Sequence, residues 1–261
     1  MPMMTKNRIS TSLVLFLTTI AIASGASAAE QKAPINHEEQ YEACLRLVES
    51  RPDSAFEAAL SWASQGGGYA AEHCATQALY ALKIYDAAAT RLEKLAQDMK
   101  SNDLLLKSQL LHQAGRAWYS HGDLDRAFAV QSTAITIYPD GTDYYIDRAE
   151  ILAEQGRFDE ALIDLEVAHS LEPERDDVLV LRASAKRFLG NDADAMTDAE
   201  KALSLNPDNM EALLERGILR RLKGDDAGAR EDWLRIVNKA LGTPAADAAQ
   251  LNLEKLDVTV N

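Results

Sequence analysis

Residues 142–175 read TDYYIDRAEILAEQGRFDEALIDLEVAHSLEPER, and the next 34 residues repeat their pattern. Within this stretch, apolar residues recur at helical spacing on both sides of Gly156. Glycine favours the left-handed backbone that ends many helices, so we expect two amphipathic helices joined by a turn at Gly156. Pro173 lacks an amide hydrogen and disfavours helical geometry at the residue before it, which predicts the end of the second helix.

The 34-residue period extends over four successive units and is kept in four separate registers. The turn glycines are Gly122, Gly156, Gly190 and Gly224; the second register holds Gly115, Ala149, Ala183 and Gly217; the third holds Ala127, Ala161, Ala195 and Ala229; the fourth holds Pro139, Pro173 and Pro207. Small residues suit places where two antiparallel helices approach to about 8–10 Å. A single helix pair cannot bury its own apolar face, so we expect neighbouring units to stack on one another.

A 34-residue helix–turn–helix unit with these small residues and a terminal proline resembles the tetratricopeptide repeat. The resemblance implies an all-α fold, a right-handed α-solenoid of stacked repeats. Its full units lie within 103–243, at 108–141, 142–175, 176–209 and 210–243. Residues 37–102 are expected to form atypical N-terminal helix pairs, with one weak repeat at 69–102. Residues 244–261 are expected to form a capping helix and tail, because Thr243 can cap a helix that starts at Pro244.

Residues 1–28 are interpreted as a secretory signal peptide. Lys6 and Arg8 precede the apolar run LVLFLTTIAIA, and small residues follow up to Ala28, where we predict cleavage. The alternative, a membrane-spanning helix, needs roughly 20 apolar residues, which is more than this run supplies. Residues 29–36 are then a linker, and we expect a soluble periplasmic protein with no membrane insertion after cleavage. Secretion from a eukaryotic cell is compatible with the same leader.

The charge balance of the chain narrows its possible partners. It has 27 Lys and Arg against 41 Asp and Glu, a formal net charge of -14. Such a surface repels phosphate backbones and anionic lipids, so we expect neither nucleic acid nor a membrane as partner. With 47% hydrophobic residues, the composition is that of a soluble globular chain with a sizeable core.

The two cysteines are expected to form a disulfide bond. Cys44 and Cys74 lie in two successive first helices of the N-terminal region, which stacking would place side by side. An exported compartment is oxidising, and a bridge closing a loop of about 30 residues stabilises by about 3–4 kcal/mol in the chain-entropy model. The alternative is a catalytic Cys74 activated by His73. Adjacent helix residues point about 100° apart, which disfavours that arrangement.

An arginine and an aspartate also repeat with the 34-residue period. The arginines are Arg148, Arg182 and Arg216 on the first helices, and the aspartates are Asp164, Asp198 and Asp232 on the second helices. In the unit at 108–141 the same places hold Ala114 and Val130, so both charges are lost together. A half-buried arginine without its acid would be costly, whereas an apolar pair would not. We therefore predict structural ion pairs within the repeats, rather than a site for acidic ligands.

If these units resemble the family, their first helices line a groove that binds a partner segment. The partner-binding candidates are His112, Arg116, Tyr119, Ile146, Glu150, Val180, Arg187, Leu214 and Arg221. Family members that clamp a carboxylate carry Lys and Asn where this chain has Ile146, Val180 and Leu214, so a carboxylate clamp is not expected. An apolar stripe edged by charges suits an amphipathic helix or an extended apolar segment. The alternative is that these residues pack against the adjoining unit.

The sequence carries no phosphate-binding glycine loop, no metal-ligand spacing and no nucleophile motif. We therefore expect no enzymatic activity and no cofactor or metal. The leading prediction is a protein-interaction scaffold or adaptor, exported to the cell envelope, that binds a protein partner. Two alternatives stay open: a holdase-like periplasmic chaperone, and an enzyme with an unrecognised site near His73 and Cys74.

Overall fold

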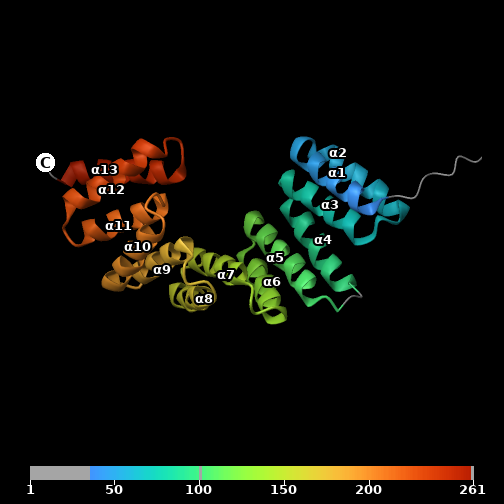
Figure 1. The fold of residues 1–261 in the computed structure, drawn as a ribbon, viewed down its shortest axis with the longest axis horizontal. Coiled ribbons are helices and arrows are strands. Elements are labelled where there is room, and N and C mark those ends of the chain that lie inside the picture. Colours follow the sequence, from blue (N-terminus) through green and yellow to red (C-terminus); the bar gives the residue numbers. More distant parts are fainter. Residues whose placement is uncertain (1–35, 100–101, 260–261) are drawn as a thin grey trace, which may run out of the picture. The chain divides into compact units, whose positions relative to one another are not determined.

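The structure is a computed structural model that describes residues 36–99 and 102–259. Over these ranges the chain is helical, without a β-strand (Figure 1). The helices are α1 (His37–Ser50), α2 (Pro52–Trp62), α3 (Gly68–Ala81), α4 (Tyr85–Asp98), α5 (Leu104–His121), α6 (Leu124–Ile137), α7 (Thr142–Glu154), α8 (Phe158–Leu171), α9 (Asp176–Phe188), α10 (Asp192–Leu205), α11 (Met210–Leu222), α12 (Asp226–Lys239) and α13 (Pro244–Thr259). A π-type turn, Ala63–Gly67, joins α2 to α3.

The helices form antiparallel pairs that stack along the chain, as a helical solenoid. Each helix packs on the next one in sequence, and alternate helices also touch, as α5 does with α7 and α9 with α11. The four predicted repeats are the pairs α5–α6, α7–α8, α9–α10 and α11–α12. The all-α solenoid predicted from the 34-residue period is confirmed. None of the described helices is long and apolar enough to cross a membrane. The predicted signal peptide at 1–28 lies outside the described residues.

The turn within each repeat depends on a left-handed backbone. Gly156 has φ 73, and its three repeat equivalents have similar positive values. In the α3–α4 pair the same place in the repeat is held by Lys83, with φ 61. Lys83 is the one non-glycine residue with positive φ within the described ranges. This backbone is costly for a residue with a Cβ, so the N-terminal pair keeps the turn of the repeat without its preferred residue.

The small residue in the first helix of each repeat matches the size of its partner in the second helix. A Cβ added to Gly217 would lie 2.3 Å from Nε1 of the fully buried Trp233. A Cβ added to Gly115 would lie 2.6 Å from Oε1 of Gln131, at the equivalent place. The other two repeats pair Ala149 with Leu165 and Ala183 with Ala199 in their cores. Glycine therefore occurs in the two repeats whose second helix presents a tryptophan or a buried amide.

The three arginine–aspartate pairs predicted from the spacing are ion pairs in the structure. The shortest contacts are 2.7 Å for Arg148–Asp164, 2.8 Å for Arg182–Asp198 and 2.6 Å for Arg216–Asp232. The aspartate of each pair is buried, and the arginine side chains are only 14–21% exposed. Each pair joins the first and second helix of one repeat. It therefore consolidates the repeat, and its charges are not available to a ligand.

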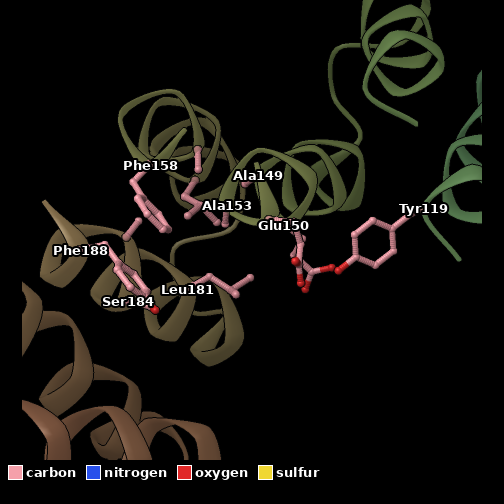
Figure 2. A pocket seen from close by; sticks show the side chains of 12 residues that line it. Tyr119, Ala149, Glu150, Ala153, Phe158, Leu181, Ser184 and Phe188 are labelled. Atoms are coloured by element: carbon pink, nitrogen blue, oxygen red, sulfur yellow. The ribbon is translucent and has the colours of Figure 1, made fainter. Parts of the chain in front are cut away.

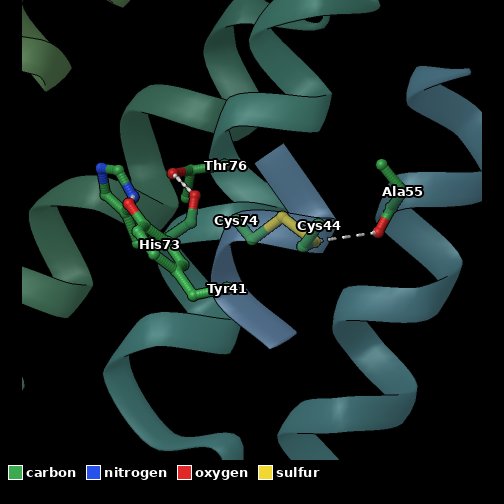
Figure 3. The surroundings of a disulfide bond; sticks show 6 residues. All are labelled: Tyr41, Cys44, Ala55, His73, Cys74 and Thr76. Carbon is green, nitrogen blue, oxygen red and sulfur yellow. Dashed lines mark hydrogen bonds between the residues drawn. A yellow bond between two sulfur atoms is a disulfide. The ribbon is translucent and has the colours of Figure 1, made fainter. Parts of the chain in front are cut away.

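A disulfide between Cys44 and Cys74 links α1 to α3, with Cα atoms 6.3 Å apart (Figure 3). Beside it, the hydroxyl of Tyr41 lies 2.7 Å from Nδ1 of His73, whose Nε2 lies 2.9 Å from Oε1 of Gln113. An amide oxygen only accepts hydrogen bonds, so Nε2 of His73 carries the proton and Nδ1 accepts from Tyr41. Burial lowers the pKa of His73, in keeping with this neutral ring. The chain of bonds ties α1 through α3 to α5.

The last helix closes the stack. Thr243 caps α13 by accepting a hydrogen bond from the amide of Ala246 at 3.3 Å. The inner face of α13 buries Ala249, Leu253 and Leu256 in one apolar cluster with Trp233 of α12 and residues of α9 and α11. Within the described residues, α13 thus covers the apolar face of the last repeat.

Candidate functional site

Three adjoining cavities follow the first helices of the repeats. The first, about 560 Å³, lies between α3 and α5; the second, about 200 Å³, reaches from α3 across α5 to α7; the third, about 420 Å³, lies between α7, α8 and α9 at the edge of α5. Tyr80 and Arg116 line both the first and the second cavity. Tyr119 and Glu150 line both the second and the third. The cavities therefore form one continuous surface, which we call the first-helix groove.

The third cavity has an apolar wall. Phe158 at the start of α8 stacks on Phe188 at the end of α9, with ring centroids 4.2 Å apart and planes 4° from parallel. Phe188 is 55% exposed, which is unusual for so large an apolar side chain. Figure 2 shows these two rings and Leu181 on one side of the cavity, with Glu150 and Tyr119 on the other. An apolar wall thus lies within the same cavity as a carboxylate and a phenol hydroxyl.

The side of α7 that borders the groove is acidic: Asp147, Glu150 and Glu154 line the cavities, and Asp143, one turn earlier, is paired with Arg175. Asp143, Asp147, Glu150 and Glu154 follow one another at intervals of four, three and four residues, which places them on one side of the helix. Arg116 is the one Lys or Arg among the described residues that line the three cavities. Its Nε lies 3.6 Å from Oδ2 of Asp147. We call the four acidic residues the α7 acidic stripe.

Asp147 is the least solvated carboxylate of the stripe. Its Oδ2 atom is buried and accepts no hydrogen bond from any described residue. The pKa of Asp147 is raised to about 7, chiefly by burial and also by the neighbouring Glu150 and Asp143, against the opposing charge of Arg116. Burial also raises the pKa of Glu150. Asp147 is therefore partly protonated near neutral pH and becomes negatively charged as pH rises through 7.

His112 lies on α5, opposite Asp147. Burial and the charge of Arg116 lower its pKa to about 4, so the ring is neutral at neutral pH. Nε2 of Gln131 donates to Nδ1 of His112 at 2.8 Å and to the carbonyl oxygen of Tyr144 at 3.0 Å. His112 is thus held as a neutral groove residue and adds no positive charge to the groove.

The N-terminal part of the groove is polar and uncharged. His73, Gln77 and Gln113 lie together there, with Nε2 of Gln77 donating to Oε1 of Gln113 at 2.8 Å. Amides and imidazoles can both donate and accept, as peptide groups require. This end of the groove is therefore suited to the backbone of a bound chain rather than to a charged group.

The structure divides the partner-binding residues predicted from the sequence into two sets. The residues that line the groove are His112, Arg116, Tyr119 and Glu150. Ile146 and Val180 are only 6% and 8% exposed and pack within apolar clusters between helices. Because Ile146 and Val180 are buried, they pack against the adjoining unit, which is the alternative that the sequence left open. The expectation that they form an open apolar stripe in the groove is corrected accordingly.

The other three predicted residues lie outside the three cavities. Arg187 on α9 forms an ion pair with Glu215 on α11 and covers one face of Phe188, with its guanidinium carbon 4.4 Å from the ring centroid. Leu214 packs on the C-terminal apolar cluster. Arg221 is half-buried at the end of α11. Because Arg187 is already paired with the buried Glu215, its charge is not available to a ligand.

Sequence reasoning missed Asp147, Glu154, Phe158 and Phe188 as groove residues. The helical spacing of the α7 acids was a readable signal, since Asp143, Asp147 and Glu150 lie within two turns. The two phenylalanines gave no such signal, because they belong to different repeats and meet only through the packing of α8 on α9.

The alternative of a catalytic Cys74 activated by His73 requires a free thiol. Cys74 is bound in the disulfide, so it offers no thiolate beside His73. Within the described ranges, no group of three or more His, Cys, Asp or Glu is arranged to hold a metal ion.

Residues 180–242 match the family model of the tetratricopeptide repeat. No curated protein matches the chain. A solved structure of pilF from Pseudomonas aeruginosa superposes with a TM-score of 0.63 at 14% identity, covering 84% of this chain and 100% of that one. MamA from Desulfovibrio magneticus RS-1, residues 41 to the end, gives 0.57 at 20% identity, covering 64% and 93%.

YrrB, described as a tetratricopeptide-repeat protein with an unusual peptide-binding site, gives a TM-score of 0.54 at 18% identity, covering 67% of this chain and 88% of that one. At these identities the likeness shows the fold alone. The family match at the C-terminal repeats, the 34-residue period and the stacked helix pairs agree with one another. Residues 180–242 therefore carry tetratricopeptide repeats, and the helix pairs before them continue the same 34-residue pattern.

Proposed function

We propose that the chain is a non-enzymatic scaffold that binds a segment of a partner protein in the first-helix groove. Proteins of this repeat family are generally interaction modules without catalysis, and a stack of repeats offers an extended binding surface. The observation that carries the proposal is the continuity of the three cavities across α3, α5, α7 and α9. With helices about 10 Å apart, such a surface accommodates about nine residues of extended chain.

The chain is also proposed to act outside the cytoplasm, at the cell envelope. The support is the leader at 1–28, with its basic residues, apolar run and small residues before Ala28. The disulfide between Cys44 and Cys74 suits an oxidising compartment. Cell fractionation followed by N-terminal sequencing tests this part. A periplasmic chain that begins at Ala29 supports it, and a cytoplasmic chain that retains the leader contradicts it.

The binding role is tested by crosslinking in cells followed by pull-down of the chain. The groove variant carries Glu150→Lys with Phe188→Ser. The matched control carries Glu166→Lys with Ile163→Ser on α8, where Ile163 is 61% exposed and lies outside the three cavities. Both variants change charge and apolar surface equally, and circular dichroism checks that both are folded.

One discrete partner, recovered with the parent and the control but lost with the groove variant, supports the scaffold. A mixture of unfolded proteins that bind without preference would favour the holdase-like chaperone instead. Recovery of the same partner by all three chains would contradict binding in the groove.

A further inference from the structure

We infer that the segment bound in the groove is a positively charged one, in which a Lys or Arg lies next to an aromatic or long aliphatic residue. The inference rests on the proposed function, since it names the chemistry of the occupant of that same groove. The positive charge would face the α7 acidic stripe, and the apolar side chain would enter the cavity beside Phe188.

The charge of the occupant follows from the acids that the fold leaves unneutralised. Within the described residues, neither Glu150 nor Glu154 forms an ion pair with a Lys or Arg, and both side chains are exposed. The fold pairs its structural acids instead, as Glu215 with Arg187 and Asp232 with Arg216. Among the described residues, Arg116 is the one Lys or Arg that lines the groove, and it already lies beside Asp147. A partner cation therefore finds two carboxylates, Glu150 and Glu154, whose charge no Lys or Arg of the described residues pairs with.

The apolar part of the occupant follows from the third cavity. Its volume of about 420 Å³ lies in the range of sites that enclose small organic groups. Phe188 presents an exposed ring stacked on Phe158, and Leu181 adds aliphatic surface to the same wall. Burying such a surface under an apolar side chain is favourable. Phe158 and Arg187 cover the two faces of the Phe188 ring, so the apolar group of the occupant would pack against its exposed edge.

The α7 acidic stripe and the apolar wall lie close enough to contact neighbouring residues of one bound segment. Glu150 and Tyr119 line both the third cavity and the one before it, so the carboxylate lies across the third cavity from the apolar wall (Figure 2). Towards α3 the groove continues into the uncharged cluster of His73, Gln77 and Gln113, which can bond to peptide groups. From α9 towards α3, the groove thus offers an apolar pocket, then the acidic residues of α7, and then polar side chains that can bond to the backbone of a bound segment.

Other occupants fit less well. An acidic segment, a nucleic acid or an anionic lipid would place negative charge against the α7 acidic stripe. A purely apolar segment would bury the charges of Glu150 and Glu154 without a cation to pair with them, at a considerable desolvation cost. A cation in the segment removes both objections, since it pairs with the carboxylates that it covers.

The test selects binders from a random 12-residue peptide library displayed on phage, using the purified chain as bait. The two strongest binders are then measured by fluorescence anisotropy with the parent and four variants. Glu150→Lys with Glu154→Lys reverses the stripe, and Glu166→Lys with Glu200→Lys makes the same change in net charge on the exposed surfaces of α8 and α10. Phe188→Ser removes the apolar wall, and Ile163→Ser is its matched control.

The inference predicts enrichment of Lys or Arg next to Phe, Trp, Tyr or Leu, with acidic residues depleted. It also predicts at least a tenfold loss of affinity on stripe reversal and on Phe188→Ser, against less than a twofold change in each control. Should the Lys variant unfold, Glu150→Gln with Glu154→Gln replaces it, and a threefold or greater loss is expected.

Enrichment of acidic or purely apolar peptides, or binding that the groove and control variants weaken equally, would overturn the inference. If acidic or apolar peptides bind and Phe188→Ser still displaces them, the proposed groove function survives and only the chemistry of the occupant is wrong. If the partner captured in cells is recovered unchanged with the groove variant, the proposed function itself fails.

Discussion

Oδ2 of Asp147 on α7 lies 3.5 Å from Nδ1 of His112 on α5, where the two repeats meet in the groove. Burial moves the pKa values of these two groups in opposite directions, to about 7 for Asp147 and to about 4 for His112. Both shifts favour the neutral form of the side chain. The groove therefore contains a carboxylate whose charge changes near neutral pH, beside an imidazole that stays uncharged there.

The first prediction concerns Asp147 and the pH dependence of stability. Its folded-state pKa of about 7 is above the usual 3.8, so its contribution to stability is full below pH 3.8 and is lost as pH rises through 7. Asp147→Asn removes the buried negative charge, and we expect it to raise the free energy of unfolding at pH 8 by about 1–2 kcal/mol. At pH 4 the variant and the parent should agree closely. Urea unfolding at both pH values measures this, and a variant less stable than the parent at pH 8 contradicts it.

The second prediction concerns the turn residue of the α3–α4 pair. Lys83 has φ 61, where the later repeats have glycine. Lys83→Gly is expected to raise the free energy of unfolding by about 0.5–1 kcal/mol, because glycine adopts this backbone without steric cost. The reciprocal control is Gly156→Ala, which should cost about 1 kcal/mol although no atom lies within 4 Å of the added Cβ. A Lys83→Gly variant no more stable than the parent, or a Gly156→Ala variant no less stable, would count against the argument in urea unfolding.

The third prediction concerns the close approach of Gly217 to Trp233. An added Cβ would meet Nε1 of the indole at 2.3 Å, and the ring is fully buried. Gly217→Ala should therefore lower the free energy of unfolding by about 1–3 kcal/mol through overpacking. Combined with Trp233→Leu, the alanine should cost much less, because the α7–α8 repeat packs Ala149 on Leu165 at the same place. A double-mutant cycle with no coupling between the two sites would show that the contact does not limit the approach of α11 and α12.

The fourth prediction concerns the bridge between α1 and α3. Replacing Cys44 and Cys74 with alanine should lower the free energy of unfolding by about 3–4 kcal/mol, since the bridge closes a loop of about 30 residues. Reducing agent should destabilise the parent and leave the double variant unchanged. Thiol titration of the unfolded parent gives the necessary check: no reactive thiol is expected without reductant and two are expected with it. Unchanged stability on reduction would contradict a structural role for the bridge.

The helices and their pairing could be predicted from the sequence because residues within a single repeat determine where its helices end and where they approach each other. Gly156 ends one helix, Pro173 ends the next, and Ala149 marks where two helices approach, all within 34 residues. The Arg148–Asp164 pair could be read in the same way, since both residues lie in one repeat and vary together in the repeat at 108–141.

The groove could be read only in part, because it depends on how one repeat sits on the next. Arg116, Tyr119 and Glu150 were found from their places on the first helices. Ile146 and Val180 occupy similar places yet are covered by neighbouring helices, which no spacing within a repeat reveals. The Phe158–Phe188 stack likewise arises between repeats. The packing of one repeat on the next decides which of these side chains are exposed in the groove and which are buried. The 34-residue period carries no information about that packing.

The central claim is that the first-helix groove binds a partner protein, and site-specific photocrosslinking tests it most directly. A photoreactive amino acid is placed at Tyr119 or Phe188 within the groove, and at Ile163 on the outer surface of α8 as the control. The account predicts one discrete crosslinked partner from both groove positions and none from Ile163. A partner that crosslinks from Ile163 and from neither groove position would contradict it.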